Sequence, residues 1–541
     1  MTLLMDRRML LKAGTLGLGA LAVPGMAQSL AARGFTHNVA SGEPRQRSVM
    51  LWTRYMPAGG DTARLSWQVS PSADFARIEA DGTAVAEEAQ DYCVKPVVEG
   101  LRAGRWYYYR FRDAAGAWSP VGRTRTLPEG RVRDFRIALF SCSNLRFGWF
   151  NAYAHAAARR DLDLVVHVGD YLYEYDERHY PDPGEELAGR SIFPASEIVR
   201  LADYRMRYAA YRADPDLQRL HQMFPVISMW DDHETANDSW EGGAQNHQPD
   251  SEGPWADRKR AAMRAYREWL PVSEDSWEDY DIGDLATLFR PETRLTARSR
   301  QLGYTALLRD QSDRAGALAR FRDGPWRDEA RTMLGGEQEA WLAGALRRST
   351  TRGARWQVLA QQVIVGSLAM PPEAATWLRP EDPASERAFF RNLIDAGQAG
   401  LPFGLDSWDG YPAARRRLLR AALDANANLV VLSGDSHNAW GFDLDLEGTP
   451  AGVEFAGQSV TSPGYETDLP HVAPAEVVRA AIARNRQLKF AETRRRGYVT
   501  VTLTPERATG EWLFLDTIRE RSTRLAGRHA MSARRGANRF A

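Results

Sequence analysis

The distribution of hydrophobic and polar positions changes near residue 130. From Phe35 to Pro128, short segments rich in aromatic and β-branched residues alternate with clusters of Gly, Pro, Asp and Ser. Short segments at such regular spacing are typical of strands in a small antiparallel β-sandwich. The pattern therefore predicts an all-β domain over residues 35–130, whose aromatic side chains form its core. The segments that indicate strands are 48–53, 64–69 and 106–111.

After Arg133 the pattern predicts strands that alternate with helices. An apolar strand at 135–140, a helix at 149–160 and a second strand at 162–168 form one β-α-β unit. We therefore expect an α/β domain over residues 131–515. The further elements predicted for it are strands at 224–230 and 428–433, a candidate strand at 356–365, and helices at 258–270 and 337–348.

The end of the chain is rich in arginine. From residue 494 onward we expect a closing pair of strands, and then a surface-packed tail over residues 516–541.

Composition excludes several classes of protein. The chain has 541 residues, with 70 Lys and Arg against 70 Asp and Glu, and 44% of it is hydrophobic. This balance excludes intrinsic disorder and a membrane bundle, and it argues against a stable nucleic-acid partner, which would require a basic excess. Cys93 and Cys142 are its two cysteines, too few for a disulfide scaffold or a zinc site built from several thiolates.

The first residues have the pattern of an export signal. Twin arginines, Arg7-Arg8, precede an uncharged run over 13–23, and residues 25–27 offer small side chains for a cleavage site. The run is shorter than the ~20 residues that span a bilayer, and the arrangement resembles a twin-arginine signal. We expect residues 1–27 to be a signal peptide read by the twin-arginine export machinery. The mature protein would then be periplasmic or secreted and have no transmembrane segment.

Candidate ligands follow four of the predicted strands. In open α/β sheets, ligands bind at the carboxyl ends of the strands. Carboxylates gathered at that edge would repel one another, and multivalent cations relieve this repulsion. The sequence therefore predicts one metal site assembled from four loops. The segments that follow the strands are Ser141-Cys142-Ser143-Asn144, Gly169-Asp170-Tyr171-Leu172-Tyr173-Glu174-Tyr175, Asp231-Asp232-His233-Glu234 with Asn237-Asp238 just beyond, and Gly434-Asp435-Ser436-His437-Asn438.

Each of these segments, taken alone, is also compatible with a purely structural role. A Gly-Asp after a strand is often a turn whose Asp caps a helix. Asp232 and His233 could be a buried pair, and residues 435–437 could be a capped loop. A lone Cys142 is more often a small buried hydrophobic residue than a ligand. Their joint occurrence at strand ends, in one order, favours a metal site.

Strings elsewhere in the chain add specificity. They include Val39-Ala-Ser-Gly-Glu-Pro44, Leu51-Trp-Thr-Arg54, Leu334-Gly-Gly-Glu-Gln-Glu-Ala-Trp-Leu342, Asp406-Ser-Trp-Asp-Gly-Tyr411, Ser459-Val-Thr-Ser-Pro-Gly464 and Arg496-Gly-Tyr498. With the four loops, they resemble the metallophosphoesterase superfamily and, within it, the alkaline phosphatase D (PhoD-like) family. The superfamily usually reads Asp-x-His, Gly-Asp, Gly-Asn-His-Asp/Glu and Gly-His-x-His. The chain keeps Gly169-Asp170, and its departures from the other motifs are shared with the PhoD-like branch.

The resemblance covers about residues 35–505. It implies an α/β metallophosphoesterase core, a β-sandwich flanked by helices, preceded by a small all-β domain of the fibronectin or immunoglobulin type. One departure is Glu292-Thr293-Arg294, where the family more often has Asp-Thr-Arg. This departure leaves the role of Arg294 open.

The resemblance also implies cofactors, namely one ferric iron and one or two calcium ions, or another divalent cation in place of calcium. Asp170 would bridge the metals. Asp231 would either bind a metal or support a ligand, and the sequence does not separate the two. The implied ligands of the iron are Cys142, Asp170, Tyr173 and His437. The implied oxygen ligands for calcium are Asp232, Asp435 and Asn237.

The predicted activity is that of an exported metal-dependent alkaline phosphatase or phosphodiesterase acting on a small or polymeric phosphoester. Metal ions neutralise the charge of the phosphate oxygens and activate a bound hydroxide that attacks phosphorus. His233 is the candidate for protonating the leaving oxygen, and Glu234 is expected to orient its ring. Asp170 and Asn237 complete the predicted catalytic set. The candidates for contacting phosphate are Asn144 and Arg146.

Three alternatives stay open at this point. Ser141 or Ser143 could form a covalent phosphoserine, although the chain has no Gly-x-Ser-x-Gly string. A phosphomonoesterase of the purple-acid-phosphatase type would use more histidines, and Asp435 stands where that type has one. A non-catalytic exported protein could use the metal site structurally and bind a wall polymer or another ligand through its β-domain.

Overall fold

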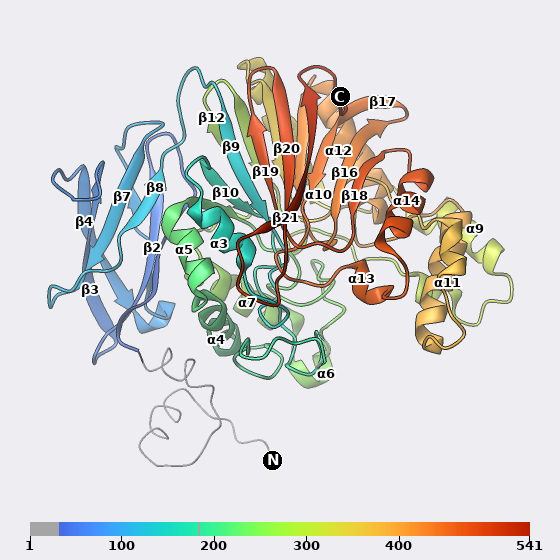
Figure 1. The fold of residues 1–541 in the computed structure, drawn as a ribbon, viewed down its shortest axis with the longest axis horizontal. Helices are drawn as coiled ribbons and strands as arrows, with labels where there is room; N and C mark the ends of the chain where they lie inside the picture. The colour runs from blue at the N-terminus through green and yellow to red at the C-terminus, as the bar shows by residue number, and fades with distance from the viewer. Residues whose placement is uncertain (1–31, 182–183) are drawn as a thin grey trace, which may run out of the picture.

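The computed structural model describes residues 32–181 and 184–541 (Figure 1). Its described part contains a ten-stranded, a seven-stranded and a four-stranded sheet. The predicted signal peptide lies outside the described residues. Among the described residues, no helix combines the length and the apolar character that crossing a bilayer requires.

The four-stranded sheet confirms the strand pattern near the N-terminus. Strand β7 (Trp106–Arg112) buries Tyr107, Tyr109 and Phe111 and leaves the intervening residues partly exposed, which is the alternation of a half-buried strand. The sheet has the order β4-β3-β7-β8, and its other strands are β3 (Thr62–Ser70), β4 (Ala80–Glu87) and β8 (Gly122–Arg125). Its apolar face packs against β1 (Gly34–Gly42), β2 (Val49–Met56), β5 (Cys93–Val94) and β6 (Val97–Val98).

Strand β1 joins this region to the rest of the protein. It pairs with β2 in antiparallel fashion. On its other side it pairs in parallel fashion with β11 (Pro225–Ser228), and Ser41 of β1 lies opposite Pro225. The all-β region therefore shares a sheet with the α/β region. Local periodicity does not predict this pairing, because the paired residues lie far apart in the sequence.

The ten-stranded sheet has the order β21-β20-β19-β9-β10-β11-β1-β2-β5, with β6 beside β2. Its centre is formed by the parallel strands β9, β10 and β11, of which β9 and β10 belong to the predicted β-α-β unit. The predicted tail 516–541 contains a third strand, β21, which forms one edge of this sheet. The strands not yet given are β9 (Phe135–Phe140), β10 (Leu164–His167), β19 (Gly497–Leu503), β20 (Arg507–Leu515) and β21 (Leu525–Arg534).

The seven-stranded sheet has the order β12-β13-β14-β15-β17-β16-β18. The candidate strand 356–365 is shorter than expected, because β14 ends at Ala360 and the next residues form a loop. The strands are β12 (Glu278–Ile282), β13 (Ala286–Arg290), β14 (Trp356–Ala360), β15 (Leu429–Ser433), β16 (Ala439–Leu446), β17 (Thr449–Ala456) and β18 (Leu488–Glu492).

The two large sheets face each other, with helices on their outer faces (Figure 1). Ile137, Val166 and Ile227 of one sheet pack against Val358 and Val430 of the other. The helices over the ten-stranded sheet are α3 (Asn151–Ala158), α4 (Leu201–Arg212), α5 (Pro215–Met223) and α7 (Trp255–Trp269), and those over the seven-stranded sheet are α10 (Gly335–Thr351) and α12 (Pro412–Asp424).

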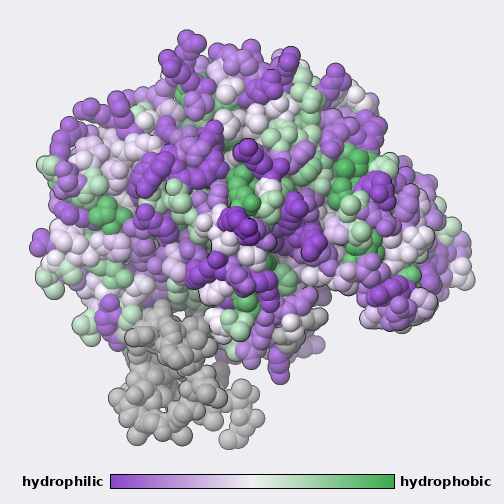
Figure 2. Space-filling model, viewed as in Figure 1, coloured by the Kyte–Doolittle hydropathy of each residue, from purple (hydrophilic) through white to green (hydrophobic). Residues whose placement is uncertain are grey.

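A helical lobe projects beside the seven-stranded sheet, at the right of Figure 1. It has its own apolar core, which includes Leu318, Phe390 and Leu393. Figure 2 shows apolar surface between this lobe and the body of the molecule. The remaining helices of the described residues are α6 (Pro249–Glu252), α8 (Tyr304–Leu308), α9 (Arg314–Asp323), α11 (Ala384–Gln398), α13 (Tyr465–Asp468), α14 (Pro474–Arg484), and the short 3₁₀ turns η1 (Glu88–Gln90), η2 (Pro325–Arg327), η3 (Pro372–Thr376) and η4 (Trp408–Gly410).

Candidate metal centre

The loops after β9, β10, β11 and β15 meet at one end of the two facing sheets. The Cys142 N–H donates to the Gly169 carbonyl at 3.2 Å, and a Cβ added to Gly434 would lie 2.5 Å from the Ser141 Cβ. Gly169 has φ +102°, and a Cβ there would lie 2.3 Å from the Asp231 Cβ. Glycine is therefore required at position 169 both by the left-handed backbone and by the close approach of the next loop.

Four of the candidate ligands have a left-handed backbone. The φ angle is 54° at Asp170, and it lies between 59° and 62° at Cys142, Asp435 and His437. A residue with a Cβ pays roughly 1–3 kcal/mol in this conformation, and such strain concentrates at functional sites. These residues therefore stand out for backbone conformation as well as for chemistry.

The side chains of these loops form three overlapping groups of potential ligand atoms. Within each group, all the ligand atoms lie within 4.8 Å of one another. Asp170 belongs to the first two groups and Asp232 to the last two, so the groups form a continuous row. The groups are Cys142 with Asp170 and His437, Asp170 with Asp232 and His233, and Asp231 with Asp232 and Asp435.

Tyr173 lies beside the first of these groups and contacts two of its members. Its hydroxyl donates to Asp170 Oδ2 at 3.2 Å and lies 3.2 Å from His437 Nε2. His437 is oriented by the other ring nitrogen, which donates to the Pro463 carbonyl at 2.5 Å. The structure thus brings together the four residues expected to bind iron.

Most carboxylates of the centre are buried and Asp435 is half-buried, and burial governs their protonation. Burial raises the pKa values of Asp170 and Asp231 well above the usual range, and it raises that of Asp435 to about 6. Asp232 differs, because Arg294 and His233 outweigh its burial and lower its pKa. Two oxygens of the centre, Asp170 Oδ1 and Asp231 Oδ2, have no hydrogen-bond partner within residues 32–181 and 184–541.

Arg294 occupies the middle of the carboxylate groups. Its fully buried guanidinium donates to Asp231, to Asp406 Oδ2 at 2.6 Å and to Asp435 Oδ1 at 2.9 Å. The role that the sequence left open is therefore electrostatic, because this cation partly neutralises the cluster. Glu292 is the residue that departs from the family pattern. Its carboxylate accepts hydrogen bonds from the Trp230 indole and from the Arg294 backbone N–H, and so fixes the loop that carries Arg294.

His233 is oriented by Glu174, a residue of the second ligand loop to which the sequence analysis assigned no role. Its Nδ1 donates to Glu174 Oε2 at 2.7 Å, and Glu174 also accepts from the Asn237 N–H and the Asn246 amide. Burial opposes protonation of the ring, but the Asp232 and Glu174 carboxylates outweigh it and raise the pKa of His233.

The expectation that Glu234 orients His233 is wrong. Glu234 accepts from the backbone N–H groups of Asp231 and Tyr171, at 2.8 and 2.6 Å, and so ties two of the ligand loops together. Its carboxylate is engaged by backbone, because the loops that follow β10 and β11 converge on it.

The remaining candidates lie at the edges of the centre. Asn144 Nδ2 and Arg146 Nη1 are buried donors without a hydrogen-bond partner in the described part of the chain. Asn237 directs its amide towards Gln245 Oε1 at 2.9 Å. Its neighbour Asp238, which the sequence analysis did not select, has its pKa raised to about 7 by burial and by Asp406 and Asp232.

Fold and site define a helix–sheet–sheet–helix protein with a buried acidic centre suited to several cations. A family model described as PhoD-like phosphatase matches residues 137–512, and a model for the N-terminal domain of the same family matches residues 20–128. The chain belongs to the PhoD-like phosphatase family and is a phosphoric ester hydrolase. The resemblance drawn from the motifs is confirmed.

Two relatives agree with this assignment. The chain is 33% identical over 510 residues to a Bacillus subtilis (strain 168) protein named alkaline phosphatase D, covering 91% of this chain and 80% of that protein. A solved structure of PhoD matches with a TM-score of 0.76 and 30% identity, covering 94% of this chain and 92% of the other. The purple-acid-phosphatase and binding-protein alternatives are not favoured by these similarities.

Proposed function

We propose that the chain is a metal-dependent alkaline phosphatase and phosphodiesterase whose cations occupy the row of ligand groups described above. One observation carries the proposal: ligand atoms from four loops meet in a buried site in which Asp170 Oδ1 and Asp231 Oδ2 lack partners. A buried acceptor without a partner costs about 1–3 kcal/mol. Cations bound between the loops would remove this cost and the mutual repulsion of the carboxylates.

The donor atoms suit two kinds of cation. A thiolate, a phenolate and an imidazole together favour ferric iron, which Cys142, Asp170, Tyr173 and His437 would hold. Carboxylate oxygens alone favour calcium, which Asp231, Asp232 and Asp435 would hold. When bound, the ions neutralise charge on the phosphate oxygens and lower the pKa of the attacking water.

The side chains of the protein would position the phosphoester and donate a proton to its leaving group. Arg294 lowers the net negative charge of the centre, so an anionic ester meets less repulsion. Asn144 Nδ2 and Arg146 Nη1 are free to donate to its non-bridging oxygens. His233, held through Nδ1 by Glu174, would protonate the leaving oxygen with its other ring nitrogen.

We extend the proposal to fold type and location. Two facing sheets between helices support a metallophosphoesterase core, and the sandwich of the four-stranded sheet with β1 and β2 supports a fibronectin-like N-terminal domain. The twin arginines and the short apolar run support export by the twin-arginine pathway to the periplasm or medium.

Replacement of Asp170 by Asn tests the proposed centre. Asp170 belongs to two ligand groups, so we expect the variant to lose more than about 99% of the turnover of p-nitrophenyl phosphate and its bis-ester. Metal analysis should show a matching loss of bound ions, while circular dichroism stays unchanged. Full turnover in the folded variant, or in chelator-treated protein shown to be free of metal, would exclude this centre.

A further inference from the structure

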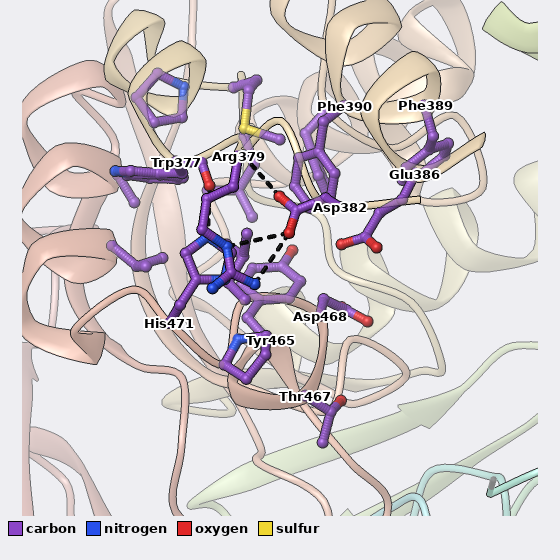
Figure 3. A pocket seen from close by; sticks show the side chains of 18 of the residues that line it. Trp377, Arg379, Asp382, Glu386, Phe389, Phe390, Tyr465, Thr467, Asp468 and His471 are labelled. Carbon is purple, nitrogen blue, oxygen red and sulfur yellow. Dashed lines mark hydrogen bonds and ion pairs between the residues drawn. The ribbon is translucent and has the colours of Figure 1, made fainter. Parts of the chain in front are cut away.

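An apolar cavity of about 620 Å³ lies between the helical lobe and the seven-stranded sheet (Figure 3). Its volume is in the range of roughly 300–1,000 Å³ that is typical of small-molecule sites. Phe389 on α11 is 49% exposed there, although aromatic side chains are usually buried. The aromatic residues of the wall are Trp377, Phe389, Phe390, Phe403, Trp440 and Tyr465.

This cavity adjoins a second cavity that reaches the candidate metal centre. The second cavity, of about 350 Å³, is lined by His437 and by Tyr180. Helix α13, a single helical turn, contributes Tyr465, Thr467 and Asp468 to the walls of both cavities. A phosphoester held beside His437 could therefore extend its organic group past this turn into the apolar cavity.

The charges of the apolar cavity discriminate against anions. Arg379 is engaged by Asp382 at 3.0 Å, and His471 Nε2 donates to the Trp377 carbonyl at 2.6 Å. Glu386 and Asp468 have no ion-pair partner within the part of the chain that the structure describes. Figure 3 shows both of these carboxylates on the side of the cavity opposite Trp377.

We propose that this cavity binds an organic substituent of the substrate, and that the enzyme prefers phosphodiesters in which this group is apolar and carries no negative charge. The inference rests on the phosphoester hydrolysis proposed above. The aromatic wall supplies the contact area for such a group, and Glu386 and Asp468 repel an additional phosphate or carboxylate. The shared turn places the group next to the reacting phosphorus.

Three diesters with one leaving group test this preference. The p-nitrophenyl esters of methyl, hexyl and 5-carboxypentyl phosphate all release p-nitrophenolate, so differences in kcat/KM report on the second substituent. We expect the hexyl ester to exceed the methyl ester about fivefold or more, and the carboxypentyl ester to lose this advantage. Equal kcat/KM for hexyl and methyl esters would overturn the proposal while leaving the hydrolytic function intact.

Substitutions in the wall of the apolar cavity test whether this cavity causes the preference for the hexyl ester. Phe389→Ala should reduce the hexyl-to-methyl ratio about threefold or more, because it removes exposed contact area. Val97→Ala changes a 51% exposed apolar residue of the N-terminal region and is the matched control, expected to leave the ratio unchanged. The double variant Glu386→Gln, Asp468→Asn should raise the carboxypentyl-to-hexyl ratio about threefold or more. Unchanged ratios in both wall variants would contradict the assignment to this cavity.

Binding measured without turnover separates this inference from the proposed function. By calorimetry, hexylphosphonate should bind about fivefold or more tightly than methylphosphonate, and Phe389→Ala should remove much of the difference. If no phosphoester is hydrolysed but this difference in binding is found, the cavity assignment stands and the hydrolytic function fails. Equal affinities for the two phosphonates would overturn the cavity assignment itself.

Discussion

Arg294 Nη2 lies 2.9 Å from Asp435 Oδ1, and because the same guanidinium also contacts Asp231, it joins the two large sheets at the candidate metal centre. Arg294 follows β13, whereas Asp435 follows β15, and the same guanidinium also contacts Asp231 after β11. One buried cation therefore offsets carboxylates delivered by two separate strands, one from each sheet. Its loss should affect stability and metal binding together.

Replacing Arg294 by Gln should destabilise the metal-free protein strongly. Removal of one partner from a buried charge cluster typically costs about 3–5 kcal/mol, because the carboxylates are left uncompensated. Calcium should restore more stability to the variant than to the unmodified protein, as measured by urea denaturation with and without the ion. Arg260→Gln, which breaks an exposed pair with Asp257, should cost less than about 1 kcal/mol. A metal-free Arg294→Gln protein as stable as this control would contradict the electrostatic role.

Replacing Glu174 by Gln should lower kcat by roughly 10–100-fold with little change in KM, because His233 would lose the carboxylate that orients it. The acidic and basic limbs of the pH–rate profile should shift in the variant, which a purely structural defect would not cause. Glu177→Gln alters an exposed residue of the same loop and should retain the normal profile. If Glu174→Gln kept the kcat and pH profile of the unmodified enzyme, Glu174 would not position His233.

Single ligand replacements should separate the two kinds of cation. Cys142→Ser should reduce bound iron and weaken the visible absorption of the iron–phenolate and iron–thiolate bonds, while calcium is retained. Asp435→Asn should reduce calcium and leave iron in place. Elemental analysis of both purified variants and of the unmodified protein measures the iron and calcium bound per protein molecule. Equal loss of both metals in both variants would show that the row of groups does not divide in this way.

Acidification should destabilise the fold through His167. This buried ring lies 2.8 Å from the Tyr153 hydroxyl, and burial lowers its pKa to about 3. Because the unfolded chain protonates near pH 6.5, it binds more protons than the folded protein between pH 6.5 and 3, so stability is lost as pH falls through this window.

The expected loss from this residue is about 1.4 kcal/mol between pH 7.5 and 5.5. Urea denaturation at the two pH values should show it in the unmodified protein, and His167→Gln should lack this component while keeping a polar partner for Tyr153. An identical loss in both proteins would assign the pH dependence to other groups.

Local pattern was sufficient for the first strands of the α/β region and for selecting the loops with candidate ligands, but it did not predict β12, β13, β16, β17 or β18. The apolar runs at 135–140 and 428–433 correspond to β9 and β15, because a buried strand is a short uninterrupted run of apolar side chains. The ligand loops could be selected because they directly follow such runs. Strand β21 was missed, since its residues are largely exposed and arginine-rich and its pairing with β20 is what defines it.

The partners of the ligands could not be predicted in this way. Glu174 contacts His233, and Arg294 contacts Asp406 and Asp435, across separations that carry no periodic signal. Glu234 was assigned to His233 because it is adjacent in sequence, yet backbone N–H groups of two loops compete for its carboxylate.

The sequence by itself determined the alternation of strands and helices that starts at residue 135, the four loops that carry the candidate ligands, and the family to which the chain belongs. These follow from side-chain chemistry and spacing within short segments. Only the tertiary structure decided that β1 enters the large sheet, that Arg294 lies among the carboxylates, and that an apolar cavity shares α13 with a second cavity lined by His437. Such relationships depend on how distant segments pack, and packing is set by the whole chain rather than by any one stretch of it.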